Sequence, residues 1–120
     1  MNPGVAVVAV FFAGMGLTAL VKPAVIWAPF GVAPTTAESR NEVRAVYGGF
    51  GVAVAALLIV ADGSAAGFRA GVLMAIAIAL LGMVAGRVVS ALVEPKALIG
   101  FPGFFMVLEA ALAGLLLTGR

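Results

Sequence analysis

Apolar residues fill four long segments of the chain, and polar residues gather in the connections between them. The segments cover residues 4–21, 45–61, 70–86 and 97–118. A helix needs about 20 residues to cross a hydrocarbon core, and the second and third segments reach this length by extending into their polar flanks. The pattern predicts a single all-α domain over residues 1–120, an integral membrane four-helix transmembrane bundle with spans at about 4–21, 36–60, 68–93 and 97–118.

The composition favours lipid as the solvent for most of this chain. It is 64% hydrophobic and 10% charged, with a mean hydropathy of +1.25, whereas soluble domains are about half apolar and a quarter charged. The first apolar segment has no basic region before it and is long for the core of a signal peptide. We therefore interpret it as a retained first span.

Local signals predict where the helices begin and end. Thr35 and Glu38, three residues apart, form a capping-box pattern that predicts the start of the second span. Residues 61–67, ADGSAAG, have the composition of a turn. Pro95 ends the third helix, and we expect the fourth to begin near residue 97.

The first connection, residues 22–34, is apolar and holds three prolines and the only tryptophan, Trp27. Prolines prevent a long regular helix here, and Trp27 and Phe30 suit the membrane interface. We predict an apolar, proline-containing loop at the interface, in preference to a short re-entrant segment.

Four spans place both termini on one side of the membrane. The side with the first and third connections carries five basic residues, Lys22, Arg40, Arg44, Arg87 and Lys96. The side with the termini carries two, Arg69 and Arg120. The positive-inside rule then predicts that these two connections are cytoplasmic. If Arg44 and Arg87 are buried in the bundle, the count of basic residues becomes three on the side of these connections against two on the side of the termini.

Glu109 is the only carboxylate within the fourth apolar segment. Counting the helical rise from the nearest polar flank places Glu109 at a depth of ~20 Å, Tyr47 at ~16 Å, and Arg44 and Arg87 at ~12 Å. Helical spacing puts one polar stripe on each of the first three spans, including Arg87 with Ser90 on the third. The predicted ligand-binding or buried polar cluster around the carboxylate is Arg40, Arg44, Tyr47, Arg87, Ser90 and Glu109.

The opposite half of the predicted bundle has no polar cluster of this kind. Residues 52–60, 71–81 and 110–117 contain no polar side chain. We therefore predict a polar funnel that opens to one side of the membrane and is closed at the other. A continuous aqueous pore would need polar lining throughout.

Three interpretations of Glu109 follow from its position. An intramembrane carboxylate is a candidate functional group. It is equally a candidate structural group, which pairs with Arg44 or Arg87 and fixes how the helices meet. If neither arginine reaches it, the carboxyl is protonated and neutral.

Two glycine motifs fall within the spans. Residues 82–86, GMVAG, form a GxxxG pattern that allows two helices to approach closely. Residues 47–51, YGGFG, allow either close packing or close approach of a ligand, and packing is the better interpretation because small residues mark helix contacts in lipid. These small-residue faces are compatible with a homo-oligomer.

Residues 39–49, SRNEVRAVYGG, resemble an uncharacterised bacterial membrane family catalogued as domain of unknown function 4345. The family pairs an Arg-x-Glu-x-Arg-Ala-x-Tyr-Gly-Gly run with a later Gly-Arg-x-x-Ser run, here matched by Arg40, Glu42, Arg44, Ala45, Tyr47, Gly48 and Gly49, then Gly86, Arg87 and Ser90. The family then continues into an acidic-Gly turn, where this chain has Glu94-Pro95. The resemblance implies a four-span protein of the bacterial inner membrane and supplies no activity.

The residue inventory narrows the possible functions. The chain has no cysteine and no histidine, which removes thiolate nucleophiles, imidazole bases and the usual zinc and haem ligands, so we predict no metal and no cofactor. Its basic residues are scattered, which argues against nucleic acid as a partner. The predicted partners are membrane lipid, a small amphipathic ligand, and a second copy or a larger membrane complex.

The favoured hypothesis is binding or transport of a small amphipathic or anionic ligand, held by its head group on Arg40, Arg44 and Arg87. The alternative is a structural or accessory subunit of a larger complex, with an internal ion-pair lock. An enzyme ranks last, because Glu109, Tyr47, Ser90, Glu42 and Glu94 form no motif that indicates a reaction. A small multidrug exporter has its essential glutamate in the first span, which here has no charge.

Overall fold

The computed structural model describes residues 1–120, and every regular element in it is helical. The elements are α1 (Pro3–Val21), α2 (Pro23–Trp27), the 3-10 turn η1 (Ala28–Phe30), α3 (Ala37–Val43), the π-helical segment η2 (Arg44–Gly49), α4 (Phe50–Asp62), α5 (Ala66–Val93), the 3-10 turn η3 (Pro95–Leu98) and α6 (Phe101–Thr118). Because α3, η2 and α4 run on as one helix, four helices are long and apolar enough to cross a membrane. The predicted all-α, four-helix architecture is confirmed.

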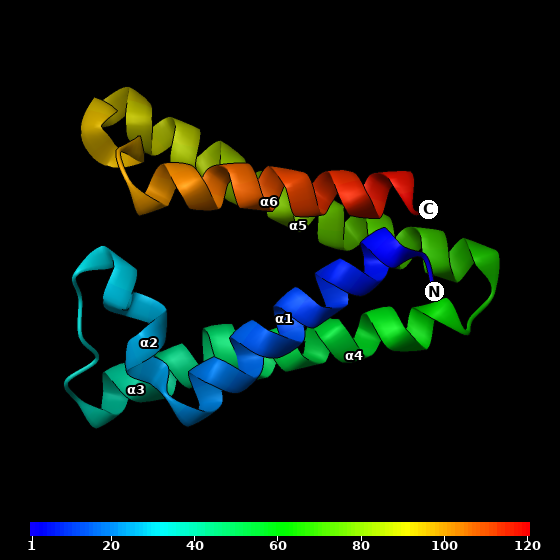
Figure 1. Cartoon of the computed structure of the whole chain (residues 1–120), viewed down its shortest axis with the longest axis horizontal. Coiled ribbons are helices and arrows are strands. Elements are labelled where there is room, and N and C mark those ends of the chain that lie inside the picture. Colours follow the sequence, from blue (N-terminus) through cyan, green and yellow to red (C-terminus); the bar gives the residue numbers. More distant parts are fainter.

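The helices form two antiparallel pairs, α1 with α4 and α5 with α6 (Figure 1). The pairs meet near the two chain termini and the α4–α5 turn, which we call the closed end. They diverge toward the other end, which carries α2, α3 and η3 and which we call the open end (Figure 1). Both termini lie at the closed end. The chain is thus held together at one end and spread at the other.

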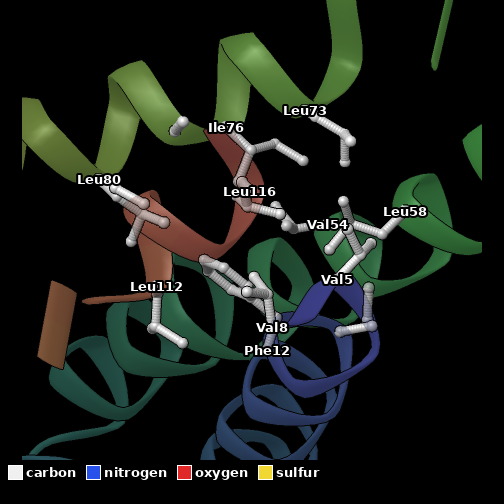
Figure 2. Close-up of a cluster of buried hydrophobic side chains, with 14 residues drawn as sticks. Val5, Val8, Phe12, Val54, Leu58, Leu73, Ile76, Leu80, Leu112 and Leu116 are labelled. Atoms are coloured by element: carbon white, nitrogen blue, oxygen red, sulfur yellow. The ribbon is translucent and has the colours of Figure 1, made fainter. Parts of the chain in front are cut away.

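The hydrophobic core explains this shape, because its residues extend from the closed end only to about the middle of the four long helices. Figure 2 shows side chains from all four long helices pointing toward one another there. In α1 the core ends at Phe12, and in α5 it ends at Leu80. The cluster consists of Val5, Val8, Ala9, Phe12, Val54, Ala55, Leu58, Leu73, Ile76, Ala77, Leu80, Leu112, Ala113 and Leu116.

Glycine sets how closely α1 and α4 approach. A methyl group at Gly16 would lie 2.6 Å from the Val52 nitrogen, and one at Gly51 would lie 2.8 Å from the Phe12 carbonyl oxygen. The glycines of the segment 47–51 that contact α1 therefore allow backbone-to-backbone packing, as small residues do between helices in lipid. The GxxxG motif at 82–86 differs, because a methyl group at either of its glycines would meet nothing within 4 Å.

Three local boundaries differ from the predicted ones. The capping box uses Thr36 and Ser39, whose side chains each bond the other's backbone N–H at 3.1 Å, in place of the predicted pair one residue earlier. The fourth long helix begins at Phe101, because Gly100 adopts a φ of 84° that interrupts the helix after η3. The first connection is mostly helical, since its prolines start the short turns α2 and η1.

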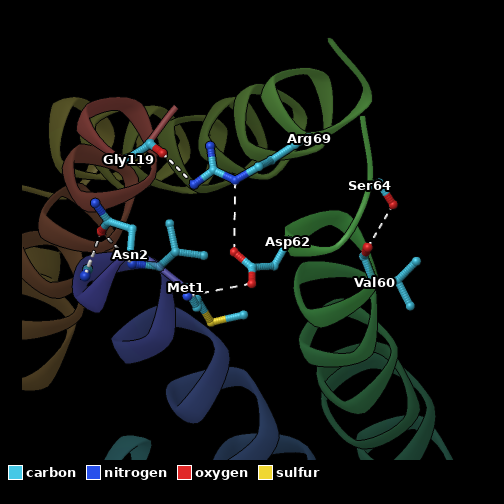
Figure 3. A network of polar contacts seen from close by, with 9 residues as sticks. Met1, Asn2, Val60, Asp62, Ser64, Arg69 and Gly119 are labelled. Carbon is cyan, nitrogen blue, oxygen red and sulfur yellow. Dashed lines mark hydrogen bonds and ion pairs between the residues drawn. The ribbon is translucent and has the colours of Figure 1, made fainter. Parts of the chain in front are cut away.

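Polar contacts fasten the helix ends at the closed end (Figure 3). Arg69, at the start of α5, donates a hydrogen bond from Nη2 to the Gly119 carbonyl oxygen at 2.8 Å, and its Nε lies 4.0 Å from Asp62 Oδ1. Asp62 Oδ2 lies 3.6 Å from the Met1 nitrogen. These contacts join the N-terminus and the ends of α4, α5 and α6 at the closed end.

Candidate functional site

One ion pair joins α5 to α6 where the core ends. Arg87 donates two hydrogen bonds to Glu109, from Nε to Oε1 at 2.7 Å and from Nη2 to Oε2 at 2.8 Å. Glu109 is 5% exposed and is the only buried charged residue of the chain. This fork geometry is the strongest form of carboxylate binding by arginine. The predicted buried ion pair is confirmed, and its cation is Arg87.

An aromatic cluster lies against the same guanidinium. The Arg87 carbon Cζ lies 5.9 Å from the ring centre of Phe105, which is within the range of cation–π attraction. Phe105 precedes Glu109 by four residues, so both side chains project from the same face of α6. Phe30 of η1 reaches across from the first connection, with its ring centre 5.6 Å from that of Phe105. Phe30 of the first connection is thereby part of the aromatic cluster beside the ion pair.

A pocket of about 480 Å³ opens beside this cluster, between the last turns of α5, η3 and the start of α6. Arg87 and Ser90 are its polar side chains, and they lie one turn apart on α5. Its walls are otherwise apolar or small, and the complete lining is Phe30, Met83, Gly86, Arg87, Ser90, Ala97, Leu98 and Pro102. Because Met83, Gly86 and Ser90 are exposed, the pocket is accessible from the surface of the bundle.

The two polar side chains of the pocket retain unused hydrogen-bonding capacity. A guanidinium carries five N–H donors, and Arg87 uses Nε and Nη2 on Glu109, while Nη1 has no partner in the protein. The Ser90 hydroxyl forms no hydrogen bond either; the Ser90 backbone carbonyl accepts from Glu94. The pocket thus presents two donor groups to whatever enters it.

Arg40, Arg44 and Tyr47 form no hydrogen bond or ion pair with Arg87 or Glu109. Arg44 donates from Nε to the Leu20 carbonyl oxygen at 3.1 Å, and Arg40 donates from Nη1 to the Pro34 carbonyl oxygen at 3.3 Å. Tyr47 is half-buried and forms no hydrogen bond. None of the three lines the pocket. The predicted six-residue cluster therefore reduces, in contacts, to Arg87 with Glu109 and the neighbouring Ser90.

The π-helical segment η2 begins at Arg44 and interrupts the uniform α-helical spacing that the predicted stripe assumed. Its i→i+5 hydrogen bonds widen the turn, so each residue adds less rotation than in an α-helix and the direction of Tyr47 relative to Arg44 changes. Arg44 then meets the last turn of α1, where backbone carbonyls have no partner within the helix and Pro23 offers no N–H. Arg44 therefore supports the end of α1, and the positive charge that reaches Glu109 comes from Arg87 alone.

Sequence reasoning missed the apolar part of this site. Phe105 is not among the predicted site residues, yet it lies against Arg87. Its four-residue spacing from Glu109 is the signal that could have identified it. The contribution of Phe30 depends on how the first connection folds back over α6, which no helical spacing indicates.

The chemistry of the site is hydrogen-bond donation beside apolar walls. No three carboxylate, histidine or cysteine side chains come together in a group that could hold a metal ion. Ser90 has no hydrogen bond to a base that could activate it. The arrangement is suited to holding a polar group in place next to hydrocarbon.

Comparison with known proteins gives the family of this chain. No curated protein and no solved structure matches it significantly. The sequence model of one family, described as Domain of unknown function (DUF4345), matches residues 3–119. This match includes both sequence runs and all four long helices. The chain therefore belongs to the DUF4345 family.

Proposed function

We propose that this protein binds a small amphipathic molecule in the pocket between α5, η3 and α6. The observation that carries the proposal is the presence of two free donor groups, Arg87 Nη1 and the Ser90 hydroxyl, in a pocket whose other walls are mainly apolar. Pockets for small molecules combine apolar walls with a few placed polar groups in this way. The two donor groups hold the head group of the ligand, and Phe30, Met83 and Leu98 contact its hydrocarbon chain.

The depth of the pocket supports an amphiphile. Ser90 lies three residues before the end of α5, and Arg87 lies six, so they are ~5 Å and ~9 Å inward from that end. At this depth polar head groups meet hydrocarbon in a bilayer. A molecule lying in the outer part of the membrane would place its head group level with the donors and its chain along the apolar walls.

Two glycines of α5 offer a matched test. Gly86 lines the pocket and Gly82, one turn earlier, does not, and an added Cβ atom meets no neighbour within 4 Å at either. Gly86→Phe should fill the pocket, whereas Gly82→Phe adds the same side chain outside it. The assay follows thermal unfolding in maltoside detergent with added laurate, methyl laurate or dodecyltrimethylammonium.

We expect at least one of these amphiphiles to raise the melting temperature of wild type and of Gly82→Phe, but not of Gly86→Phe. Equal responses of all three proteins would show that the pocket is not the binding site. No response of wild type to any of the three would contradict the proposal for single-chain amphiphiles.

A second candidate function is that of a structural or accessory subunit. The observation that favours it is the fork between Arg87 and Glu109, which already occupies the arginine and joins α5 to α6 as an internal lock. Purification from membranes in a mild detergent distinguishes the two functions. A larger partner at fixed stoichiometry supports the accessory role, and a stable isolated protein weakens it.

We also propose that the chain resides in the bacterial inner membrane with α2, α3 and η3 on the cytoplasmic side. Arg44 is exposed, so only Arg87 is withdrawn into the bundle, and four basic residues remain on this side against two on the other. Because the chain has no cysteine, Ser64→Cys and Lys96→Cys can be labelled separately in intact cells. An impermeant maleimide should react with Ser64→Cys only.

A further inference from the structure

The charge balance of the pocket determines which head group it can accept. Arg87 is the only charged residue in the lining, and its charge is matched by Glu109 through two hydrogen bonds shorter than 3 Å. Glu94 and Lys96, in the connection beside the pocket, are opposite in sign, and neither lines it. The site is therefore electrically neutral although it contains a guanidinium.

Neutrality disfavours an anion. A carboxylate entering the pocket would be attracted by Arg87 and repelled by Glu109, which lies directly behind the same guanidinium, so little net attraction remains. It would also lose much of its hydration, and desolvating a charge costs far more than desolvating a carbonyl. A cationic head group is equally unsuited, because the Arg87 guanidinium repels it and the carboxylate of Glu109 is already occupied and buried.

A neutral carbonyl oxygen meets neither obstacle. It has two lone pairs, so it can accept one hydrogen bond from each of two groups, Arg87 Nη1 and the Ser90 hydroxyl. A hydrogen bond from a charged donor is stronger than one between neutral groups, and the arginine can supply it without giving up Glu109. The apolar walls formed by Phe30, Met83, Leu98 and Pro102 then contact the hydrocarbon beside the carbonyl.

We propose that the pocket is selective for uncharged amphiphiles that carry a carbonyl group, such as the ester of an acyl chain, over anionic and cationic amphiphiles of the same length. This proposal rests on the proposed function, because it assigns the ligand class of the same site. The two donors act together: Arg87 Nη1 and Ser90 Oγ hold one carbonyl oxygen, and Glu109 keeps the guanidinium oriented toward it.

The test compares dodecyl compounds of different head group on one protein. Methyl laurate, laurate, dodecyltrimethylammonium and dodecane are titrated at pH 8 into wild type, Ser90→Ala and Ser64→Ala, with the melting temperature as the readout. Ser64→Ala is the matched control, because it removes the same hydroxyl at the closed end, where Ser64 donates to the Val60 carbonyl.

We expect methyl laurate to bind wild type about tenfold more tightly than laurate, because of the larger desolvation cost of the carboxylate. Ser90→Ala should weaken methyl laurate binding about fivefold, the value of one hydrogen bond, and Ser64→Ala should leave it unchanged. A competition assay identifies the source of the ester, with diester phosphatidylcholine and its ether-linked analogue, which lacks carbonyls, as competitors of methyl laurate. If the diester lipid competes and the ether analogue does not, the ligand is a membrane lipid.

The outcomes separate the two proposals. Laurate binding as tightly as methyl laurate, with a loss in Ser90→Ala, would overturn the selectivity for neutral carbonyls and leave the binding function standing. Dodecane binding as tightly as methyl laurate would also overturn it, because the carbonyl would then contribute nothing. Binding that Gly86→Phe blocks but Ser90→Ala leaves unchanged would overturn the selectivity alone. If no compound binds in a way that Gly86→Phe blocks, both proposals fail.

Discussion

The closed and open ends of this bundle are stabilised by different kinds of interaction. At the closed end, aliphatic side chains from all four long helices interlock, and the polar contacts of Asp62 and Arg69 lie outside that core. At the open end the two helix pairs diverge (Figure 1), and the principal polar link is the fork between Arg87 and Glu109 within one pair. Packing unites the pairs at one end, and charge joins two helices at the other.

The difference indicates where the protein can hold a ligand. Between helices in lipid there is no hydrophobic driving force, so association depends on close packing and on polar contacts. A fully packed half has no room for another molecule. In the open half, where one ion pair joins α5 to α6 beyond the core, a pocket of about 480 Å³ lies beside that pair. Substitutions at each end can test this division of roles.

The largest effect is expected at the ion pair. Glu109→Gln keeps the size of the side chain but removes the charge, so the Arg87 guanidinium loses its counter-ion. Removing one member of a buried pair costs about 3–5 kcal/mol, and the partial exposure of Arg87, 24% of its side chain, places the loss near the lower limit. We expect about 3 kcal/mol, measured by denaturation in detergent.

The double substitution Arg87→Met with Glu109→Leu sharpens this prediction. Replacing both members of a buried pair by apolar groups is often neutral or stabilising, so most of the lost stability should return. Wild-type stability of Glu109→Gln would contradict the lock, and the carboxylate would then have to be explained by function alone.

The next largest effect is expected in the core of the closed end. Leu116 is fully buried and Leu92 is 80% exposed on α5. Leu116→Ala leaves a cavity among four helices and should cost about 2 kcal/mol, the low end for such substitutions, because the unfolded helix is still surrounded by lipid. Leu92→Ala is the matched control, and it should change the stability by less than about 0.5 kcal/mol.

Equal losses in Leu116→Ala and Leu92→Ala would show that the exposed face of α5 is packed against something in the membrane. The difference in stability between the two variants therefore measures how much the core contributes, and the loss in Leu92→Ala alone reports whether the exposed face of α5 contacts another molecule.

A smaller effect is expected where Arg44 supports the end of α1. Arg44→Gln removes the hydrogen bond to the Leu20 carbonyl. Hydrogen bonds from charged groups contribute up to a few kcal/mol when buried, but Arg44 is exposed, so we expect about 1 kcal/mol. Hydrogen exchange should become faster over the last turn of α1 and stay unchanged in α6.

Arg40→Gln is the control for this substitution, because its hydrogen bond joins Pro34 in the first connection and leaves α1 untouched. If Arg44→Gln accelerated exchange in α6 as well, Arg44 would act on the ion pair after all, as the helical spacing predicted.

The sequence predicted the parts of this structure that follow from local patterns. Apolar segments predicted four helices, and one carboxylate within the fourth predicted an arginine partner, either Arg44 or Arg87. The predicted depth of ~20 Å for Glu109 was too large, because α6 begins at Phe101 and Glu109 lies ~12 Å from that end, as Arg87 does from Pro95 on the regular helix α5. The resemblance to the family, carried by Arg40 to Gly49 and by Gly86 to Ser90, is confirmed over residues 3–119.

What could not be predicted depends on irregular backbone. The π-helical segment η2 changes where Arg44 and Tyr47 point, and its six residues carry no pattern that distinguishes it from an α-helix. The fold of the first connection likewise decides that Phe30 lines the pocket. A short break at Gly100 moves the start of α6 and, with η3, shapes the other wall. Each of these features depends on tertiary packing.

The smallest effect, and the only one expected to stabilise, concerns the GxxxG motif of α5. Gly82 lies in the middle of the helix, and an added methyl group meets no atom within 4 Å. Alanine is favoured over glycine inside a helix by about 0.5–1 kcal/mol, so Gly82→Ala should raise the stability by about 0.5 kcal/mol. Measured destabilisation would contradict this and show that another helix packs on the motif, as in a homo-oligomer. Cross-linking at increasing detergent-to-protein ratios would then distinguish a second copy from a different partner, because only a second copy gives a product of twice the chain mass.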